Sequence, residues 1–181
     1  MALKATVCKA QLQVSDMDRG YYAAHALTLA QHPSETVERL MVRLLAFSLF
    51  ADELLQFGRG VSSDDEPDLW QRSLDGRIEH WIDLGQPDES RIRRACGRSE
   101  AVTVIGYAPR SFDPWWDKHG AALVALKPLQ VLCLPMGAAE SLAGLHGRSM
   151  DLQCLIQDGT VQLIDAAQTV EITPRWLKRQ D

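Results

Sequence analysis

The first part of the chain alternates between apolar and polar residues, the period-two pattern of a half-buried β-strand. Apolar positions are odd up to Val7 and even from Cys8 onward. This change of phase predicts a strand over residues 3–14 with a bulge near Val7, which would keep one face inward throughout. Residues 21–31 are predicted to return as the hairpin partner of this strand.

From Ser34 the pattern becomes helical. Apolar residues then recur three or four positions apart as far as Leu49, and Glu35 falls in the first turn of the predicted helix. A second helix is predicted over residues 88–99, with Asp88 as its N-cap.

The remaining elements follow from short apolar runs and turn signals. Residues 101–107 are nearly all apolar, which is typical of a strand covered on both faces. Asp158-Gly159 is a strong two-residue hairpin signal. Strands are predicted at 54–57, 68–73, 77–84, 101–107, 129–134, 152–157 and 160–165, and short helices at 112–120 and 137–146.

From residue 34 the element order is helix, three strands, helix and strand. This order predicts an α/β (α+β) protein with a mixed β-sheet flanked by helices, an N-terminal hairpin and a C-terminal β-hairpin. A chain of 181 residues with 46% hydrophobic residues can bury a core without disulfides or structural metals. No repeat or linker divides it, so a single domain over residues 1–181 is expected.

The four cysteines lie far apart, with no Cys-x-x-Cys pair and no matching histidine spacing. They therefore suggest neither a zinc site nor a redox pair, and reduced thiols are expected. Lys4 and Lys9 interrupt any signal peptide, and no uncharged run of about 18 apolar residues is present. A cytoplasmic protein without a membrane segment is expected.

The formal net charge of −5 argues against a broad basic surface for nucleic acid. The acidity is concentrated, however. Residues 61–90 hold nine acids and two arginines, whereas residues 91–120 hold six basic and three acidic residues. The acidic segment therefore needs its own explanation.

Two acids of this segment sit at the ends of neighbouring predicted strands: Asp68, after Pro67, and Asp83. Adjacent strands lie about 4.8 Å apart, so carboxylates at matching levels can share a divalent ion. Oxygen ligands favour Mg²⁺ or Mn²⁺, and Glu38 on the preceding helix offers a third acid. Glu79 competes with Asp68 as a ligand. Alternatively, these acids only form turns and a solvated loop.

Several motifs occur together along the whole chain. They are MALKAT at the start, HPSET at 32–36, ADE at 51–53, LQF at 55–57, RG at 59–60, DDEP at 64–67 and WIDLGQPDE at 81–89. With these motifs the chain resembles the YaeQ family of small bacterial proteins. The resemblance implies a compact, diverged member of the PD-(D/E)XK nuclease-like superfamily, with a core of helix, three strands, helix and strand.

The resemblance also implies roles for individual residues. The first motif carboxylate corresponds to Asp68, the second to Asp83, and the glutamate of the first core helix to Glu38. Gly85 stands where nucleases of this superfamily usually carry a lysine that positions water or stabilises charge on the phosphate. Gln86, or a cation from the next helix, would have to replace that lysine.

Arg91, Arg94 and Arg98 form a cationic stripe on the predicted helix 88–99. Arg94 or Arg91 is the candidate substitute for the lysine, and all three could contact nucleic acid, since arginine holds phosphate in a bidentate manner. A stripe kept for solubility is the alternative. Trp115 and Trp116 either stack on bases or pack in the core.

Three hypotheses follow for function. The first is a metal-dependent nuclease, in which Asp68, Asp83 and Glu38 bind Mg²⁺ or Mn²⁺ while Gln86 or Arg94 assists. The second is a catalytically inactive nuclease-fold protein that acts as a nucleic-acid-binding or regulatory module. The third is protein association through an open edge of the hairpin 152–164. The sequence specifies no protein partner. Nucleic-acid binding is expected to be weak without metal, because a divalent ion would offset the acidic segment.

Overall fold

The computed structural model describes residues 4–59 and 65–180 and divides into two compact units. Unit 1 consists of Met1–Ala51 and Gly137–Thr173, and unit 2 of Asp52–Met136 and Pro174–Asp181. Gly60 and Asp64, which belong to the sequence motifs, lie outside the described residues. The expectation of one domain over residues 1–181 stays a prediction.

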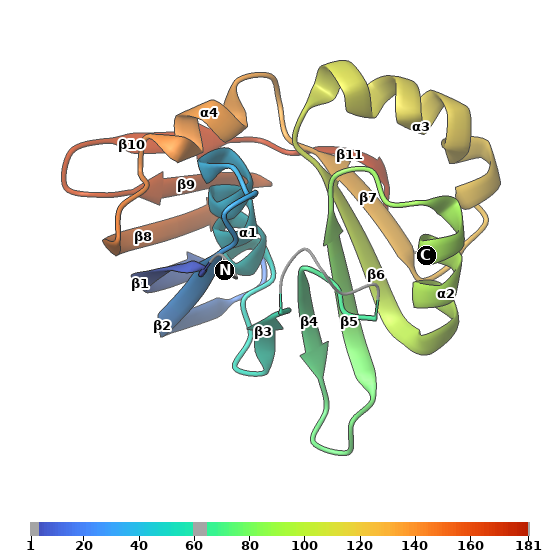
Figure 1. Cartoon of the computed structure of the whole chain (residues 1–181), viewed down its shortest axis with the longest axis horizontal. Coiled ribbons are helices and arrows are strands. Elements are labelled where there is room, and N and C mark those ends of the chain that lie inside the picture. Colours follow the sequence, from blue (N-terminus) through green and yellow to red (C-terminus); the bar gives the residue numbers. More distant parts are fainter. Residues whose placement is uncertain (1–3, 60–64, 181) are drawn as a thin grey trace. The chain divides into compact units, whose positions relative to one another are not determined.

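Unit 1 contains a five-stranded mixed sheet, called sheet A, with strand order β10-β9-β8-β1-β2 (Figure 1). Strands β1 and β8 pair in parallel, and the other neighbours pair antiparallel. Helix α1 packs on helix α4. The elements are β1 (Thr6–Asp16), β2 (Tyr21–Gln31), α1 (Val37–Leu49), α4 (Ala138–Ala143), β8 (Ser149–Gln157), β9 (Thr160–Ile164) and β10 (Thr169–Ile172).

The N-terminal hairpin is confirmed, but the expected bulge near Val7 is wrong. Pairing of β1 with β2 runs without interruption from Thr6 opposite Gln31 to Asp16 opposite Tyr21. The strand begins only at Thr6, so the change of phase falls at its start. Val7 is exposed, and the even-numbered side chains from position 8 onward are the buried ones.

The C-terminal hairpin is also confirmed. Asp158 and Gly159 both have positive φ, as a two-residue turn between strands requires. The prediction of an open edge on this hairpin is wrong, because β8 also pairs with β1 and β9 also pairs with β10. Strand β10 has four residues, too few to show a period in the sequence.

Helix α1 begins at Val37, three residues later than the pattern predicts. Thr36 is the N-cap, and its side chain accepts a hydrogen bond from the Arg39 backbone N–H. Glu35 therefore precedes the helix instead of lying in its first turn. Its buried carboxylate accepts hydrogen bonds from the guanidinium groups of Arg39 and Arg43.

Unit 2 contains a six-stranded mixed sheet, called sheet B, with strand order β11-β7-β6-β5-β4-β3. The three central strands β5, β6 and β7 are parallel. The elements are β3 (Leu55–Phe57), β4 (Leu69–Arg72), β5 (Ile78–Leu84), α2 (Glu89–Arg98), β6 (Ser99–Gly106), α3 (Pro109–Leu123), β7 (Leu129–Cys133) and β11 (Arg175–Lys178).

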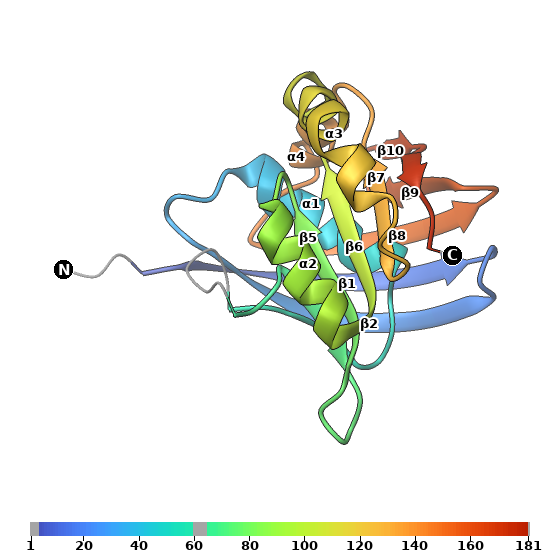
Figure 2. The same ribbon diagram turned by 90° about the vertical axis from the view of Figure 1, so that its right-hand side faces the viewer.

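One face of sheet B carries the helices, with α2 on β6 and α3 on β7 (Figure 2). In α2, Ile92 and Ala95 face inward and the arginines lie on the remaining surface. The core of unit 2 forms between these helices and the sheet; its buried residues include Trp81, Ile92, Ala95, Val102, Val104, Phe112, Leu123, Leu129 and Val131.

The predicted class is confirmed: the chain is an α/β (α+β) protein with mixed sheets flanked by helices, and its element order is consistent with a nuclease-like fold. The strands form two sheets, however, where one was expected. All four cysteines are free thiols, and burial raises the pKa of Cys154 to about 12, so this thiol stays protonated at neutral pH. Among the helices of the described residues, none is long and apolar enough to cross a membrane.

Candidate functional site

Four of the five predicted site residues lie in unit 2, close to the ends of β4 and β5. Asp68 directly precedes β4, Asp83 lies on β5, Gln86 follows β5, and Arg94 lies on α2. The fifth, Glu38, is half-buried on α1 in unit 1. The candidate site described below is therefore the one that unit 2 forms by itself.

Asp68 is held in place by backbone contacts. Its Oδ2 accepts a hydrogen bond of 2.8 Å from the Leu84 N–H, which ties the start of β4 to the end of β5. Its carbonyl oxygen accepts a second bond, of 2.9 Å, from the Gly58 N–H. A Cβ on Gly58 would lie 1.9 Å from the Pro67 carbonyl oxygen, so only glycine permits this close approach. Asp68 thus joins three segments of unit 2.

Asp83 is buried, with 3% of the residue exposed, and its charge is matched by Arg91 of α2. The Arg91 Nε donates to Oδ2 at 2.8 Å, and the Arg91 Nη2 donates to Oδ1 at 3.0 Å. Oδ2 also accepts a hydrogen bond of 2.9 Å from the Trp81 indole N–H. Both carboxylate oxygens are therefore engaged in a bidentate pair of the strong, charge-assisted kind.

As they are arranged, these carboxylates do not fit a divalent ion. The guanidinium of Arg91 takes the place that a cation would need at Asp83, and Oδ2 of Asp68 faces a backbone N–H. Within residues 4–59 and 65–180, no group of three or more His, Cys, Asp or Glu is placed to hold a metal ion. The expected Mg²⁺ or Mn²⁺ site stays a prediction, and it requires Arg91 to leave Asp83.

The backbone explains why glycine stands in the lysine position of the motif. Gly85 has a φ of +88°, and its N–H donates to the Ile105 carbonyl oxygen at 2.9 Å. Residues with a side chain rarely adopt that φ, so a lysine here would strain the end of β5. The neighbouring Gln86 is exposed and donates to the Ser111 Oγ at 2.9 Å. Glu79, the rival ligand, accepts from Gln71 at 2.8 Å.

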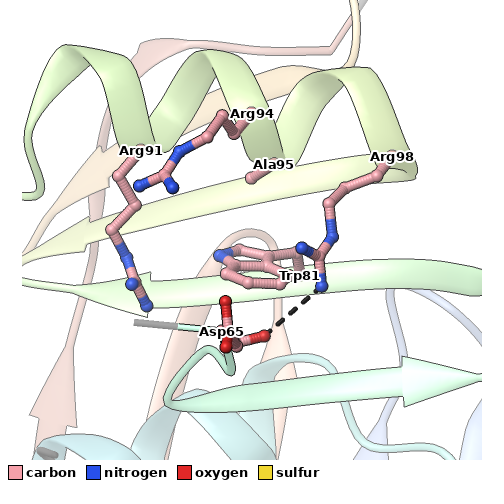
Figure 3. A pocket seen from close by; sticks show the side chains of 6 residues that line it. All are labelled: Asp65, Trp81, Arg91, Arg94, Ala95 and Arg98. Atoms are coloured by element: carbon pink, nitrogen blue, oxygen red, sulfur yellow. Dashed lines mark hydrogen bonds between the residues drawn. The ribbon is translucent and has the colours of Figure 1, made fainter. Parts of the chain in front are cut away.

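The three arginines of the stripe line one small pocket with Asp65, Ala95 and the indole of Trp81 (Figure 3). The guanidinium carbons of Arg91 and Arg98 lie 5.4 and 5.1 Å from the Trp81 ring centroid, within cation–π range. The Arg98 Nη2 also donates to the Asp65 carbonyl oxygen at 3.3 Å. Arg94 is exposed and makes no hydrogen bond or ion pair with any described residue.

The tryptophans of α3 serve packing. Trp115 and Trp116 are both partly buried against the core of unit 2, and the Trp115 ring contacts Phe112 and His119. Trp116 fills the space next to Gly120, where a Cβ would come within 2.7 Å of the indole. The packing interpretation of this pair is the one that the geometry supports.

A family model described as "YaeQ protein" matches residues 1–174 of the chain. The chain belongs to the YaeQ family. Relatives described as "Uncharacterized protein YaeQ" from Salmonella typhi and Escherichia coli (strain K12) are 46% and 43% identical to it over 172 residues, covering 95% of this chain and 95% of each relative.

Two solved structures of the YaeQ family share the fold. The crystal structure of the YaeQ protein from Xanthomonas axonopodis pv. citri is 56% identical, with a TM-score of 0.94, and the match covers 96% of this chain and 98% of that chain. The corresponding structure from Pseudomonas syringae is 39% identical, with a TM-score of 0.92, and the match covers 97% of each chain.

Sequence reasoning about this YaeQ-family chain missed the partner of Asp83. The sequence suggests that Arg91 contacts nucleic acid or replaces the motif lysine, whereas its guanidinium pairs with the buried Asp83 carboxylate. One signal was available: Asp83 shares a face of β5 with the large apolar side chain of Trp81, and an acid that is buried beside such a residue needs a counter-charge. The arginine of the next helix, eight residues away, supplies it.

Proposed function

We propose that this chain binds the phosphate backbone of nucleic acid through α2, as a non-catalytic member of a nuclease-like fold. The observation that carries the proposal is the pocket around Trp81, where three arginines gather and Arg94 has no partner among the described residues. Helix α2 carries four arginines and one glutamate. A guanidinium fork matches phosphate oxygens, so Arg94 and Arg98 are the residues proposed to contact the anion.

The same geometry argues for binding rather than cleavage. Arg91 neutralises Asp83, so the pocket beside it presents positive charge where a nuclease would present metal-ligating carboxylates. The lysine position is a glycine whose backbone conformation disfavours any side chain. A nuclease would need Arg91 to release Asp83 and a second cation to replace the lysine.

Recognition is expected to be independent of base sequence. Trp81 is only 2% exposed, so its ring supports the arginines and is not available to stack on a base. Contacts to phosphate fix the position of a protein on nucleic acid but carry no sequence information. Affinity should therefore fall steeply with salt, because bound phosphates release counterions.

Replacing Arg94 with glutamine is expected to weaken binding of a fluorescent oligonucleotide about three- to tenfold and to lower the slope of log K against log salt by about one. Fluorescence anisotropy at several salt concentrations measures both quantities, with single-stranded and double-stranded probes of unrelated sequences.

Arg93→Gln is the matched control, because Arg93 is exposed on the same helix and pairs with Glu89 outside the pocket. It removes the same charge and is expected to change the affinity less than about twofold. An equal loss of oligonucleotide affinity in Arg94→Gln and Arg93→Gln would contradict binding at the pocket around Trp81. If the wild type cleaves the probe in Mn²⁺ and Asp83→Asn does not, the nuclease hypothesis would be supported over non-catalytic binding.

A further inference from the structure

Strand β2 forms one end of sheet A and, in the part of the chain that the structure describes, it pairs only with β1. It is eleven residues long, YYAAHALTLAQ, with no charged residue and no proline. Natural proteins protect exposed strand edges with charges, proline, bulges or short length. The opposite end of the sheet follows that rule, since β10 has four residues and includes Glu171. Strand β2 has none of these protections.

Hydrogen bonds of β1 show which backbone groups of β2 face outward. The N–H groups of Lys9 and Met17 donate to carbonyl oxygens of Arg148 and Ile156, on the β8 side of β1. Odd-numbered residues of β1 therefore direct their backbone groups toward β8. Their partners in β2 are even-numbered, such as Thr28 opposite Lys9, and direct theirs away from β1.

The outward edge of β2 thus consists of the N–H and C=O groups of Tyr22, Ala24, Ala26 and Thr28. Beyond them the Ala30 carbonyl oxygen accepts a hydrogen bond of 2.9 Å from Arg43, which closes that end of the edge. The side chains of the four residues are exposed on the outer face of the sheet. An extended, uncharged and unprotected edge is left between Tyr22 and Thr28.

We propose that this edge pairs with β2 of a second copy of the chain, antiparallel about a two-fold axis at His25. In that register Tyr22 lies opposite Thr28 of the second copy, and Ala24 lies opposite Ala26 of the second copy. Every outward N–H and C=O group between these positions can form a hydrogen bond with the second copy, and no like charges face each other. The outward N–H and C=O groups are complementary to their own copies in this antiparallel register, and no charged side chain of the strand opposes the pairing, which is why a second copy is the occupant inferred. The result is a closed dimer whose sheet A continues across the axis.

The test is sedimentation velocity across the micromolar range, followed by two double substitutions. Ala24→Lys with Ala26→Lys places like charges opposite each other across the axis, whereas Ala24→Lys with Ala26→Glu places opposite charges there. The wild type is expected to shift from monomer to dimer with concentration. The first variant is expected to dimerise about fivefold more weakly or worse, and the second to dimerise at least as well as the wild type. All substituted side chains are on the outer face, and thermal melts at low concentration check that both variants fold.

Amide hydrogen exchange gives a second measurement on the unmodified chain. The outward amides of Ala24 and Ala26 should gain protection as concentration rises, while the amides of Ala23 and His25 should already be protected by β1. A wild type that stays monomeric would overturn the proposal. So would a dimer that leaves the Ala24 and Ala26 amides unprotected, or two double variants that associate alike. This inference does not depend on the proposed nucleic-acid binding.

Discussion

Replacing Glu35 with methionine is expected to lower the free energy of unfolding by about 3 to 5 kcal/mol. The Glu35 side chain is 2% exposed and forms two hydrogen bonds with Arg43, of 3.0 Å from Nε and 2.6 Å from Nη2. Without Glu35, the buried guanidinium of Arg43 keeps its hydrogen bond to the Ala30 carbonyl oxygen but loses the carboxylate that it pairs with. A buried charge without its counter-charge is costly, and methionine keeps a similar side-chain volume.

Arg39→Met is the matched control for this pair. Arg39 donates to Oε2 of Glu35 at 2.9 Å, but the Arg39 side chain is 20% exposed. Its replacement is therefore expected to lower the free energy of unfolding by about 1 kcal/mol or less. The five tryptophans all lie in unit 2. Urea denaturation of the Glu35 and Arg39 variants is therefore best followed by far-UV circular dichroism, with amide exchange along α1 as the local measure. If Glu35→Met and Arg39→Met lower the free energy of unfolding equally, burial of the Glu35–Arg43 pair does not determine the loss of stability.

Replacing Arg91 with methionine is expected to destabilise unit 2 by about 3 kcal/mol. The guanidinium contacts both oxygens of Asp83, whose side chain is 4% exposed. Without Arg91, the carboxylate keeps the Trp81 indole N–H but loses its counter-charge, and the Glu66 carbonyl oxygen loses a hydrogen bond of 2.9 Å. Urea denaturation followed by tryptophan fluorescence reports on this unit directly.

The double variant Asp83→Asn with Arg91→Met separates charge from packing. It removes both charges and leaves an amide oxygen that can still accept from Trp81, so its stability is expected to return to within about 1 kcal/mol of the wild type. A double variant as unstable as Arg91→Met alone would mean that Arg91 stabilises unit 2 by contacts other than the pair with Asp83.

In unit 2 the sequence predicts β5 and α2 well because each shows a clear period, whereas the four-residue strand β11 is not among the predicted elements. The strand expected at 77–84 is β5 (Ile78–Leu84), and the helix expected at 88–99 is α2 (Glu89–Arg98). The division into two sheets was not predictable in this way. It depends on the parallel pairing of β1 with β8, which lie far apart in the chain, and pairing between distant strands leaves no local pattern.

The sequence predicted that the arginine stripe lies near Asp83, but it did not predict which contacts these side chains make. Spacing alone brought Asp68, Asp83 and the arginine stripe into one region, and unit 2 does place Asp83 and Arg91 together. Which cation faces Asp83 depends on the orientation of side chains across a helix and a strand, which spacing does not give. The positive φ at Gly85 is likewise a property of the turn after β5.

Oligonucleotide binding in EDTA, compared with binding in Mg²⁺ at the same ionic strength, tests the central claim most directly. The sequence alone suggested that binding would be weak without metal. Because Arg91 already neutralises Asp83, binding through α2 is expected to be equally strong in both buffers and to weaken in Arg94→Gln. Binding that requires Mg²⁺ and disappears in Asp83→Asn would contradict a metal-independent phosphate pocket.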